Sequence, residues 1–129
     1  MSAPATEVLE AAAELVRCFG EGRRDDYFAC FAPEATFAFY NAPAVFESRS
    51  AYEAAYDEWV ADGWRVDSCA SEGGRVTLVG EDVAVFTHDV ATEITTAAGP
   101  ESLAERETIV FRREGVRWVA VHEHLSTRP

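Results

Sequence analysis

The sequence predicts an α+β fold in which three N-terminal helices pack on a strongly curved antiparallel sheet to form a half-cone. Apolar residues recur at helical spacing in the first half of the chain, whereas the second half consists of long β-type segments separated by short turns. An antiparallel sheet of such long strands curls around the helices on one of its faces. The 129 residues suffice for one domain, covering 1–129, with a real core.

The first helix is expected from Glu7 to Gly20, because one face of this segment is apolar and the other is charged. A second, short helix contains Tyr27, Phe28 and Phe31 and should end before Pro33, since proline interrupts a helix. A strand is then expected over residues 35–40, which are rich in aromatic side chains.

A capping box predicts the start of the third helix, because Ser50 is followed three positions later by Glu53. The helix should run to about Asp62 and stop at Gly63. One face carries an aromatic stripe, which is typical of a helix that packs on a sheet. The stripe consists of Tyr52, Tyr56, Trp59 and Val60.

The remaining segments predict a β-meander. Strands are expected over residues 65–79, with a break at the Gly73-Gly74 pair, and over residues 82–96. A terminal hairpin follows, with its turn at Glu114-Gly115. Complementary charges favour one register for this hairpin. That register pairs Phe111 with Trp118, Glu107 with His122, Glu105 with His124, and Arg106 with Glu123.

The chain is strongly acidic, with 11 Lys and Arg residues against 23 Asp and Glu residues and a net charge of -12 at pH 7. Such a surface repels phosphate backbones and anionic lipid, so neither nucleic acid nor a membrane is expected as a partner. The 3 cysteines lack metal-ligand spacing and are typical of free thiols in a reducing compartment. Since there is also no basic leader and no transmembrane run, we expect a cytoplasmic protein.

The order of these elements resembles that of the nuclear transport factor 2-like superfamily. Phe31-Ala-Pro-Glu-Ala-Thr36 leads into the first strand as it does in SnoaL-like and ketosteroid isomerase-like small proteins. The last strand begins with Arg117-Trp118 and ends in His122-Glu-His-Leu-Ser126, which is similar to the association domain of calcium/calmodulin-dependent kinase II. The resemblance implies a cystatin-like half-cone, a homodimer formed through the outer face of the sheet, and a deep apolar pocket between its inner face and the helices.

The superfamily includes isomerases, cyclases, dehydratases and silent assembly modules, so particular residues must decide the function. The resemblance places the tyrosine and the general-base aspartate of the classical ketosteroid isomerase on Leu15 and Phe39, and its second aspartate near Glu107. Because phenylalanine cannot carry a proton between carbons, the resemblance argues against classical steroid isomerisation.

Two faces of the terminal hairpin compete for the predicted pocket. The first carries Glu105, Glu107, His122 and His124. A carboxylate beside each imidazole would form an acid–base pair working near neutral pH. The second face carries Arg106 and Glu123 as a single ion pair among apolar residues, which could orient a polar ligand. The resemblance to the kinase association domain places a cavity-facing arginine at the position of Leu125, which favours the second face. Because this chain has leucine there, it lacks the anion-binding group of that arginine. The sequence leaves both alternatives open.

A purely structural interpretation is also consistent with these residues. His122 and His124 would then line a dimer interface, with Phe111 and Trp118 supplying its apolar area. The aromatic stripe of the third helix would serve helix-to-sheet packing.

Further pocket candidates are Phe39, Tyr40, Trp59, Trp64 and His88. Tyr40 ends the first strand and could point its hydroxyl into the cavity mouth, which Trp64 could close. His88 and the two hairpin histidines are potential metal ligands, but their spacing does not match a metal-binding motif. Neither a metal nor a cofactor is therefore expected. No serine–histidine–carboxylate constellation is recognisable either.

These observations predict a homodimeric protein that binds a small apolar molecule. It would be a cofactor-free isomerase, cyclase or dehydratase acting on a carbonyl compound, with His122 or His124 as the base and Glu107 orienting it. The alternative is a non-catalytic ligand-sensing or oligomer-assembly module.

Overall fold

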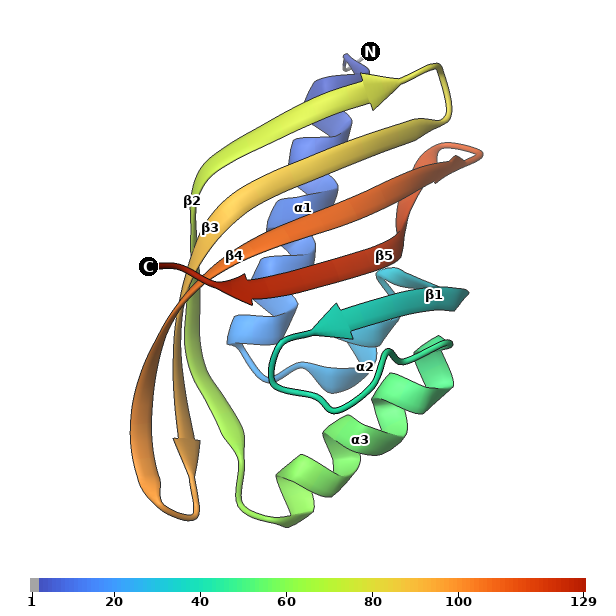
Figure 1. The fold of residues 1–129 in the computed structure, drawn as a ribbon. Helices are drawn as coiled ribbons and strands as arrows, with labels where there is room; N and C mark the ends of the chain where they lie inside the picture. The colour runs from blue at the N-terminus through green and yellow to red at the C-terminus, as the bar shows by residue number, and fades with distance from the viewer. Residues whose placement is uncertain (1–2) are drawn as a thin grey trace.

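The computed structural model describes residues 3–129, which form three helices packed against one five-stranded sheet (Figure 1). The helices are α1 (Pro4–Gly20), α2 (Arg24–Phe28) and α3 (Arg49–Ala61). The strands are β1 (Phe31–Phe39), β2 (Arg65–Val79), β3 (Val83–Thr96), β4 (Gly99–Glu114) and β5 (Arg117–Thr127). No helix in this range is long and apolar enough to cross a membrane.

The strand order in the sheet is β1-β5-β4-β3-β2. Neighbours along the meander from β2 to β5 are antiparallel, whereas the edge strand β1 runs parallel to β5. The long strands β2, β3 and β4 bend strongly, so the sheet curves around the helices (Figure 1). The predicted α+β half-cone is confirmed. The parallel pairing joins segments far apart in the chain, so local periodicity could not reveal it.

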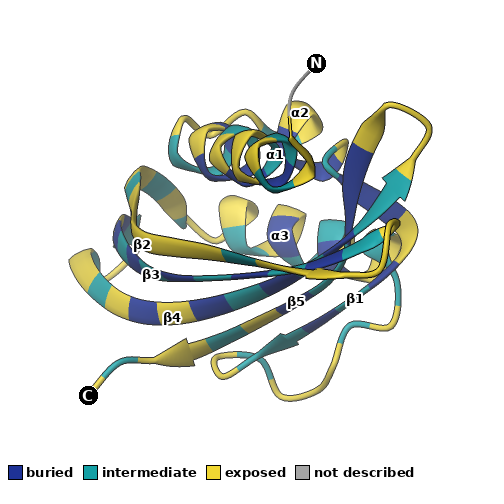
Figure 2. Cartoon of the chain, turned by 90° about the horizontal axis from the view of Figure 1, so that it is seen from above, coloured by how far each residue is buried: buried dark blue, intermediate teal, exposed yellow. Residues whose placement is uncertain are grey.

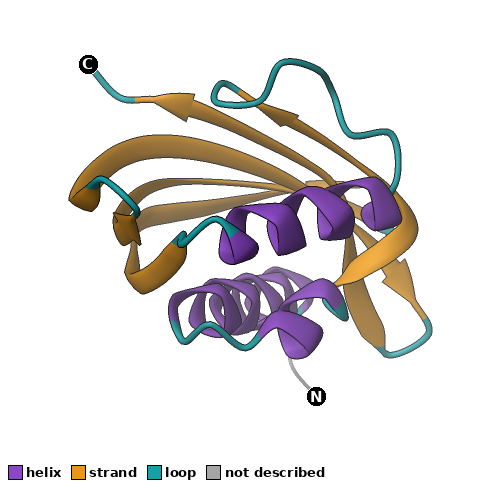
Figure 3. Cartoon of the chain, turned by 90° about the horizontal axis from the view of Figure 1, so that it is seen from below, coloured by secondary structure: helices purple, strands orange, loops and turns teal. Residues whose placement is uncertain are grey.

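The helices all lie on the concave side of the sheet, where the buried residues gather (Figures 2 and 3). Val8 and Leu15 of α1 pack there with Phe37 of β1 and Phe111 of β4, all of which are buried. Burying a side chain of this size contributes roughly 1.5–3 kcal/mol. The core therefore fixes α1 across the sheet and leaves the space beside α3 for a cavity.

The N-terminal elements differ in their bounds from the prediction. α1 begins at Pro4 rather than Glu7, because proline in the first helical turn costs no hydrogen bond. α2 ends at Phe28, and Phe31 already belongs to β1, which also contains Pro33. Since β1 lies at the edge of the sheet, a proline is tolerated there.

The N-terminal cap of α3 is Ser48 rather than Ser50. Ser48 has extended backbone angles, and its hydroxyl accepts a hydrogen bond from the backbone N–H of Ala51 at 3.1 Å. Glu53 does not complete a capping box with Ser50. Its carboxylate instead forms an ion pair with Arg49, with 3.3 Å between Oε2 and Nε.

The register predicted for the terminal hairpin is wrong. Its two-residue turn starts at Gly115, one position later than expected, so that Glu114 pairs with Arg117. Gly115 has a φ of 66°, which glycine adopts without strain. A β-bulge beside Phe111 then shifts the pairing once more along the hairpin.

As a result, none of the four expected cross-strand pairs forms. Glu107 pairs with Leu125 and Glu105 with Thr127, while His122 lies opposite Val110. Cross-strand charge pairs contribute only about 0.2–1 kcal/mol each, so the turn and the bulge outweigh them in setting the register.

Candidate functional site

A cavity lies between the helices and the concave face of the sheet. Its volume is about 80 Å³, several times the ~10–15 Å³ that one water molecule needs on the same measure, so a small organic molecule has room there. Much of its wall is apolar or aromatic. The aromatic lining residues are Phe19, Tyr27, Phe39, Tyr52, Trp59 and Trp64.

Three carboxyl groups line the sheet wall of this cavity. Glu105 and Glu107 point inward from alternate positions of β4. Glu123 points to the same side from β5, because the bulge places it opposite the buried Ile109. The three residues are 4%, 7% and 3% exposed, respectively. Buried carboxyl groups are rare without cationic or hydrogen-bonding partners, which makes this cluster the first candidate for chemistry.

A hydrogen-bonded chain leads from this cluster toward the surface. His88 of β3 has its Nε2 2.7 Å from Oε1 of Glu107 and its Nδ1 2.6 Å from Oγ of Ser71 on β2. The His88 side chain is fully buried, whereas Ser71 is exposed in a groove between α1 and β2. Because a carboxylate can only accept, we assign the proton to His88 Nε2, which leaves Nδ1 to accept from the Ser71 hydroxyl. The chain offers protons a path between the cavity and the groove.

This arrangement corrects the expectation that no serine–histidine–carboxylate constellation exists. Ser71, His88 and Glu107 come from three neighbouring strands, and no local motif contains them. The available signal was the alternation of β3, in which His88 follows the buried Ala84 and Phe86 on the inward face.

Glu123 has the least usual environment of the three carboxyls. Burial, and next the negative charge of Glu107, raise the pKa of Glu123 well above its ordinary value. A hydrogen bond between the two carboxyls acts in the same direction. Oε1 of Glu123 has no hydrogen-bond partner among the residues that the structure describes. Glu123 therefore holds its proton to higher pH than an ordinary glutamate does, and in its neutral form it can donate a hydrogen bond.

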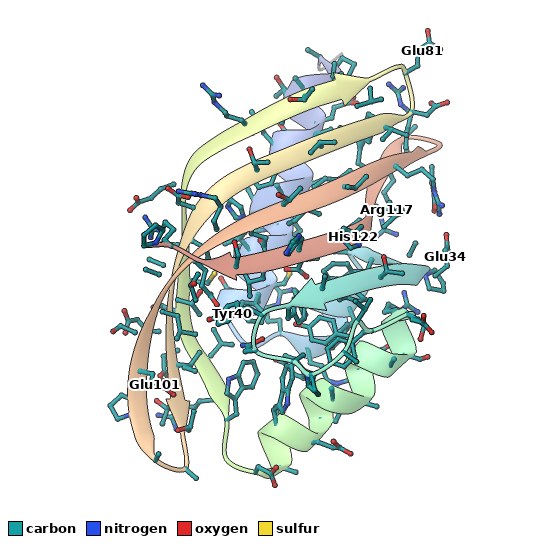
Figure 4. The ribbon with its side chains drawn as sticks, in the orientation of Figure 1. Glu34, Tyr40, Glu81, Glu101, Arg117 and His122 are labelled. Carbon is teal, nitrogen blue, oxygen red and sulfur yellow. The ribbon has the colours of Figure 1, made fainter. Side chains whose placement is uncertain are left out.

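Glu105 is held by hydroxyl groups. Tyr40, at the end of β1 (Figure 4), donates from its hydroxyl to Oε2 of Glu105 at 2.6 Å. Burial raises the pKa of Glu105, while the hydrogen bonds from Tyr40 and Thr92 lower it. These two hydroxyls fix the carboxyl at one end of the cluster.

The helix side of the cavity carries two buried phenols. The hydroxyl oxygens of Tyr27 and Tyr52 are 2.9 Å apart, and burial raises the pKa of both side chains. Cys69 lines the cavity from β2, and burial raises the pKa of its thiol to about 11. A thiolate nucleophile is therefore not favoured here.

The structure brings most of the predicted pocket residues to the cavity. Tyr40 reaches it through Glu105, and His88 lies behind Glu107. The predicted residues that line the cavity directly are Phe39, Trp59, Trp64, Glu107 and Glu123.

The two hairpin histidines lie on the outer face of the sheet instead. His122 (Figure 4) has its Nδ1 2.7 Å from Oγ1 of Thr36, and His124 is exposed beside Ala38 of β1. Burial, and next the neighbouring His124, lower the pKa of His122. The expected contacts of these histidines with Glu107 do not form, because the corrected register turns their side chains away from it.

Arg106 also lies outside the cavity. Its Nε is 3.1 Å from Oδ1 of Asp89 on the outer face, where the Arg106 side chain is exposed and that of Asp89 is half-buried. The predicted ion pair between Arg106 and Glu123 is therefore wrong, and Glu123 lacks that cation. The cavity wall combines parts of both predicted hairpin faces, with Glu105 and Glu107 from one and Glu123 from the other.

Metal ligation finds no geometric support in the described range. Within residues 3–129, no group of three or more His, Cys, Asp and Glu side chains is arranged to hold a metal ion.

The curved sheet, the helices on its concave side and the enclosed cavity define a small protein of the nuclear transport factor 2-like class. Residues 8–129 match the model of the SnoaL-like domain. Because this match spans nearly the whole chain, the protein belongs to the SnoaL-like domain family, which confirms the resemblance found in the sequence.

Solved structures share this fold. A ketosteroid isomerase-like protein from Erwinia carotovora atroseptica has a TM-score of 0.86 at 15% identity, covering 100% of this chain and 99% of that one. The CaMKII hub of S. rosetta has a TM-score of 0.80 at 23% identity, covering 99% of each chain. An NTF2-like protein of unknown function in nutrient uptake from Rhodospirillum rubrum has a TM-score of 0.81 at 18% identity, covering 95% of this chain and 98% of that one. These identities are low enough that the likeness shows the fold alone. No curated protein has significant sequence similarity to this chain.

Proposed function

We propose that the protein is a cofactor-free enzyme that performs acid–base chemistry on a small, largely apolar carbonyl compound held in the cavity. One observation carries this proposal: Glu107 and Glu123, two carboxyls in contact, face the same apolar cavity in different environments. Paired titratable groups whose surroundings differ are the usual basis for separate acid and base roles.

The roles follow from the partners of each group. Glu107, supported by the buried His88, is the base that removes a proton from the carbon next to the carbonyl. Glu123 keeps its proton and donates a hydrogen bond to the carbonyl oxygen, which gains negative charge as the carbon loses its proton. Return of the proton to a different atom gives an isomerase, and loss or attack of a neighbouring group gives a dehydratase or a cyclase.

His88 and Ser71 complete the proposal as a route for protons. With Nε2 of His88 donating to Glu107 and Nδ1 accepting from Ser71, the chain can pass a proton from the groove, through the imidazole, to Glu107 in a step that consumes one. This assignment differs from the one expected from the sequence, in which His122 or His124 was the base and Glu107 oriented it, because both of those histidines face away from the cavity.

Exchange of carbon-bound hydrogen tests the chemistry without knowledge of the natural substrate. Small cyclic ketones in deuterated water lose their α-proton NMR signals when a base enolises them, and we expect the protein to accelerate this loss. Glu107→Gln should reduce the enzyme-dependent rate by at least ~100-fold, as is typical when a general base is removed.

Glu10→Gln is a matched control, because it makes the same charge change at an exposed position of α1. Exchange at the buffer rate with every ketone, or full activity in Glu107→Gln, would refute the acid–base proposal.

A second candidate function is oligomer assembly through the outer face of the sheet. Val85 and Val110 lie side by side on that face next to His122, and all three are half-buried in the single chain. Phe111 and Trp118, expected to supply apolar area there, are instead buried on the inner side, where the Trp118 indole donates to Glu7 of α1. The similarity to a CaMKII hub fold is consistent with a homo-oligomer, and a homodimer remains our proposal.

The three cysteines at positions 18, 30 and 69 are free thiols in the structure. This state is typical of a reducing compartment and supports the proposed cytoplasmic location.

A further inference from the structure

We propose that the carbonyl compound bound in the cavity also carries a primary amine, with its ammonium group against Glu123 and Glu105 and its apolar body against the aromatic wall. This inference rests on the proposed use of the cavity as the substrate site, and it specifies the chemical class of the ligand.

The first argument is the sign of the charges around the cavity. Of the residues that line it within the described range, three are glutamates and none is lysine or arginine. Arg106, which could have neutralised the cluster, pairs with Asp89 on the outer face. A carboxylate ligand would find no cationic partner among these lining residues, whereas an ammonium ion would be attracted both locally and by the net charge of -12.

The second argument is an unfilled hydrogen-bonding position. Oε1 of Glu123 is buried and has no partner among the described residues, although Glu123 lines the cavity. A buried polar atom without a partner costs about 1–3 kcal/mol, so a ligand that donates a hydrogen bond to it is favoured. An ammonium group has three such donors, and donors that carry charge form the stronger bonds.

The third argument is the shape and chemistry of the remaining wall. The ring centroids of Tyr52 and Trp59 are 6.2 Å apart, and those of Trp59 and Trp64 are 5.6 Å apart, so these residues form a continuous aromatic surface. Aromatic faces attract cations as well as alkyl groups. One surface therefore suits both the apolar body of the ligand and the carbon next to its nitrogen.

Binding should release a proton from the protein. An ammonium ion stabilises the ionised form of a neighbouring carboxyl. Burial raises the pKa of Glu105, so Glu105 gives up its proton as the ligand arrives, while Glu123 keeps its own. The titratable side chains that face Glu123 come from all the surrounding elements. They are Glu105 and Glu107 on β4, His88 on β3 behind Glu107, Cys69 on β2, Tyr27 on α2 and Tyr52 on α3. Tyr40, which follows β1, contacts Glu105 through its hydroxyl.

The test uses three probes with one ring and different head groups: cyclohexylamine, cyclohexanol and cyclohexanecarboxylate. Isothermal titration calorimetry of the whole protein at pH 7 should show at least ~10-fold tighter binding of the amine than of the alcohol, equivalent to one charge-assisted hydrogen bond. The carboxylate should not bind. Titrations in buffers of different ionisation enthalpy should show proton release with the amine only.

Variants connect the preference to the proposed residue. Glu123→Gln should weaken amine binding by at least ~10-fold and leave alcohol binding within about twofold, while Glu10→Gln should change neither. Equal binding of amine and alcohol, absence of binding by all three probes, or an unchanged amine affinity in Glu123→Gln would overturn the inference.

This result is separable from the enzymatic proposal. Amine binding without ketone exchange would support the ligand class and refute the chemistry. Ketone exchange without any amine preference would support the chemistry and refute the ligand class.

Discussion

At the scale of single residues, Glu123 is the side chain that most distinguishes this protein from an ordinary apolar core. It is 3% exposed, contacts a second carboxyl and faces a cavity. An unfolded glutamate has a pKa of about 4.3, whereas the folded chain holds the proton of Glu123 to higher pH. Folding is therefore coupled to proton uptake at this position.

The sign of the effect on stability follows from this coupling. Between the unfolded and the folded pKa of Glu123, the folded state binds more protons than the unfolded state, so the free energy of unfolding falls as pH rises. Glu123→Gln removes the titration. We expect the free energy of unfolding of the variant, relative to wild type, to increase by about 1 kcal/mol or more between about pH 4.5 and pH 8, since each pKa unit corresponds to about 1.4 kcal/mol.

Urea unfolding of both proteins at several pH values measures this difference. The free energy of unfolding of Glu10→Gln, a change at an exposed site, should vary with pH as that of the wild type does. If the free energy of unfolding of Glu123→Gln also varies with pH as that of the wild type does, burial does not raise the pKa of Glu123.

At the scale of elements, small local devices determine where the functional side chains point. The bulge in the β4–β5 hairpin is the main example, because the register beyond it places Glu123 on the cavity side and His122 on the outer side. A shift of one residue exchanges the two faces of a strand. The site therefore depends on backbone geometry far more than on the complementary charges along the hairpin.

The start of α3 gives an element-scale prediction. Ser48→Ala should lower the free energy of unfolding by about 1 kcal/mol, because the backbone N–H of Ala51 loses its cap. Ser50→Ala is the comparison, and we expect it to cost only a few tenths of a kcal/mol, since Ser50 caps no backbone group. Thermal or urea unfolding distinguishes the two, and equal losses would mean that the cap is assigned to the wrong serine.

At the scale of the whole molecule, the sheet divides the protein into a cavity side and an outer side. The half-buried outer valines and histidine are the surface on which we expect a second copy to pack. Light scattering during size-exclusion chromatography should give the mass of a dimer for wild type. Val110→Asp, at the centre of that surface, should give a monomer because burying a carboxylate there is costly.

Val79→Asp is the matched control, because Val79 is 54% exposed at the end of the edge strand β2. It should remain dimeric. A monomeric wild-type protein would count against assembly and leave the cavity proposal as the main one.

Local patterns in the sequence were enough for the helices, the long strands, the fold class and the family, because periodicity and short motifs act over neighbouring residues. They also brought Phe39, Trp59, Trp64 and Glu123 into consideration, all of which line the cavity. The observed bounds of the early elements and the observed cap of α3 differ from the predicted ones. Sequence alone does not distinguish between two nearby serines as the cap, or between a proline that ends a helix and one that lies in an edge strand.

Only the tertiary structure decided which hairpin residues face the cavity and which residues support Glu107. The pairing of Ser71 with His88 and of His88 with Glu107 joins three strands across the sheet, and it depends on the register of each. Registers are set by turns, bulges and core packing acting together, which no short stretch of sequence contains. For this reason the sequence determined what kind of protein this is, whereas the folded chain determined where its chemistry lies.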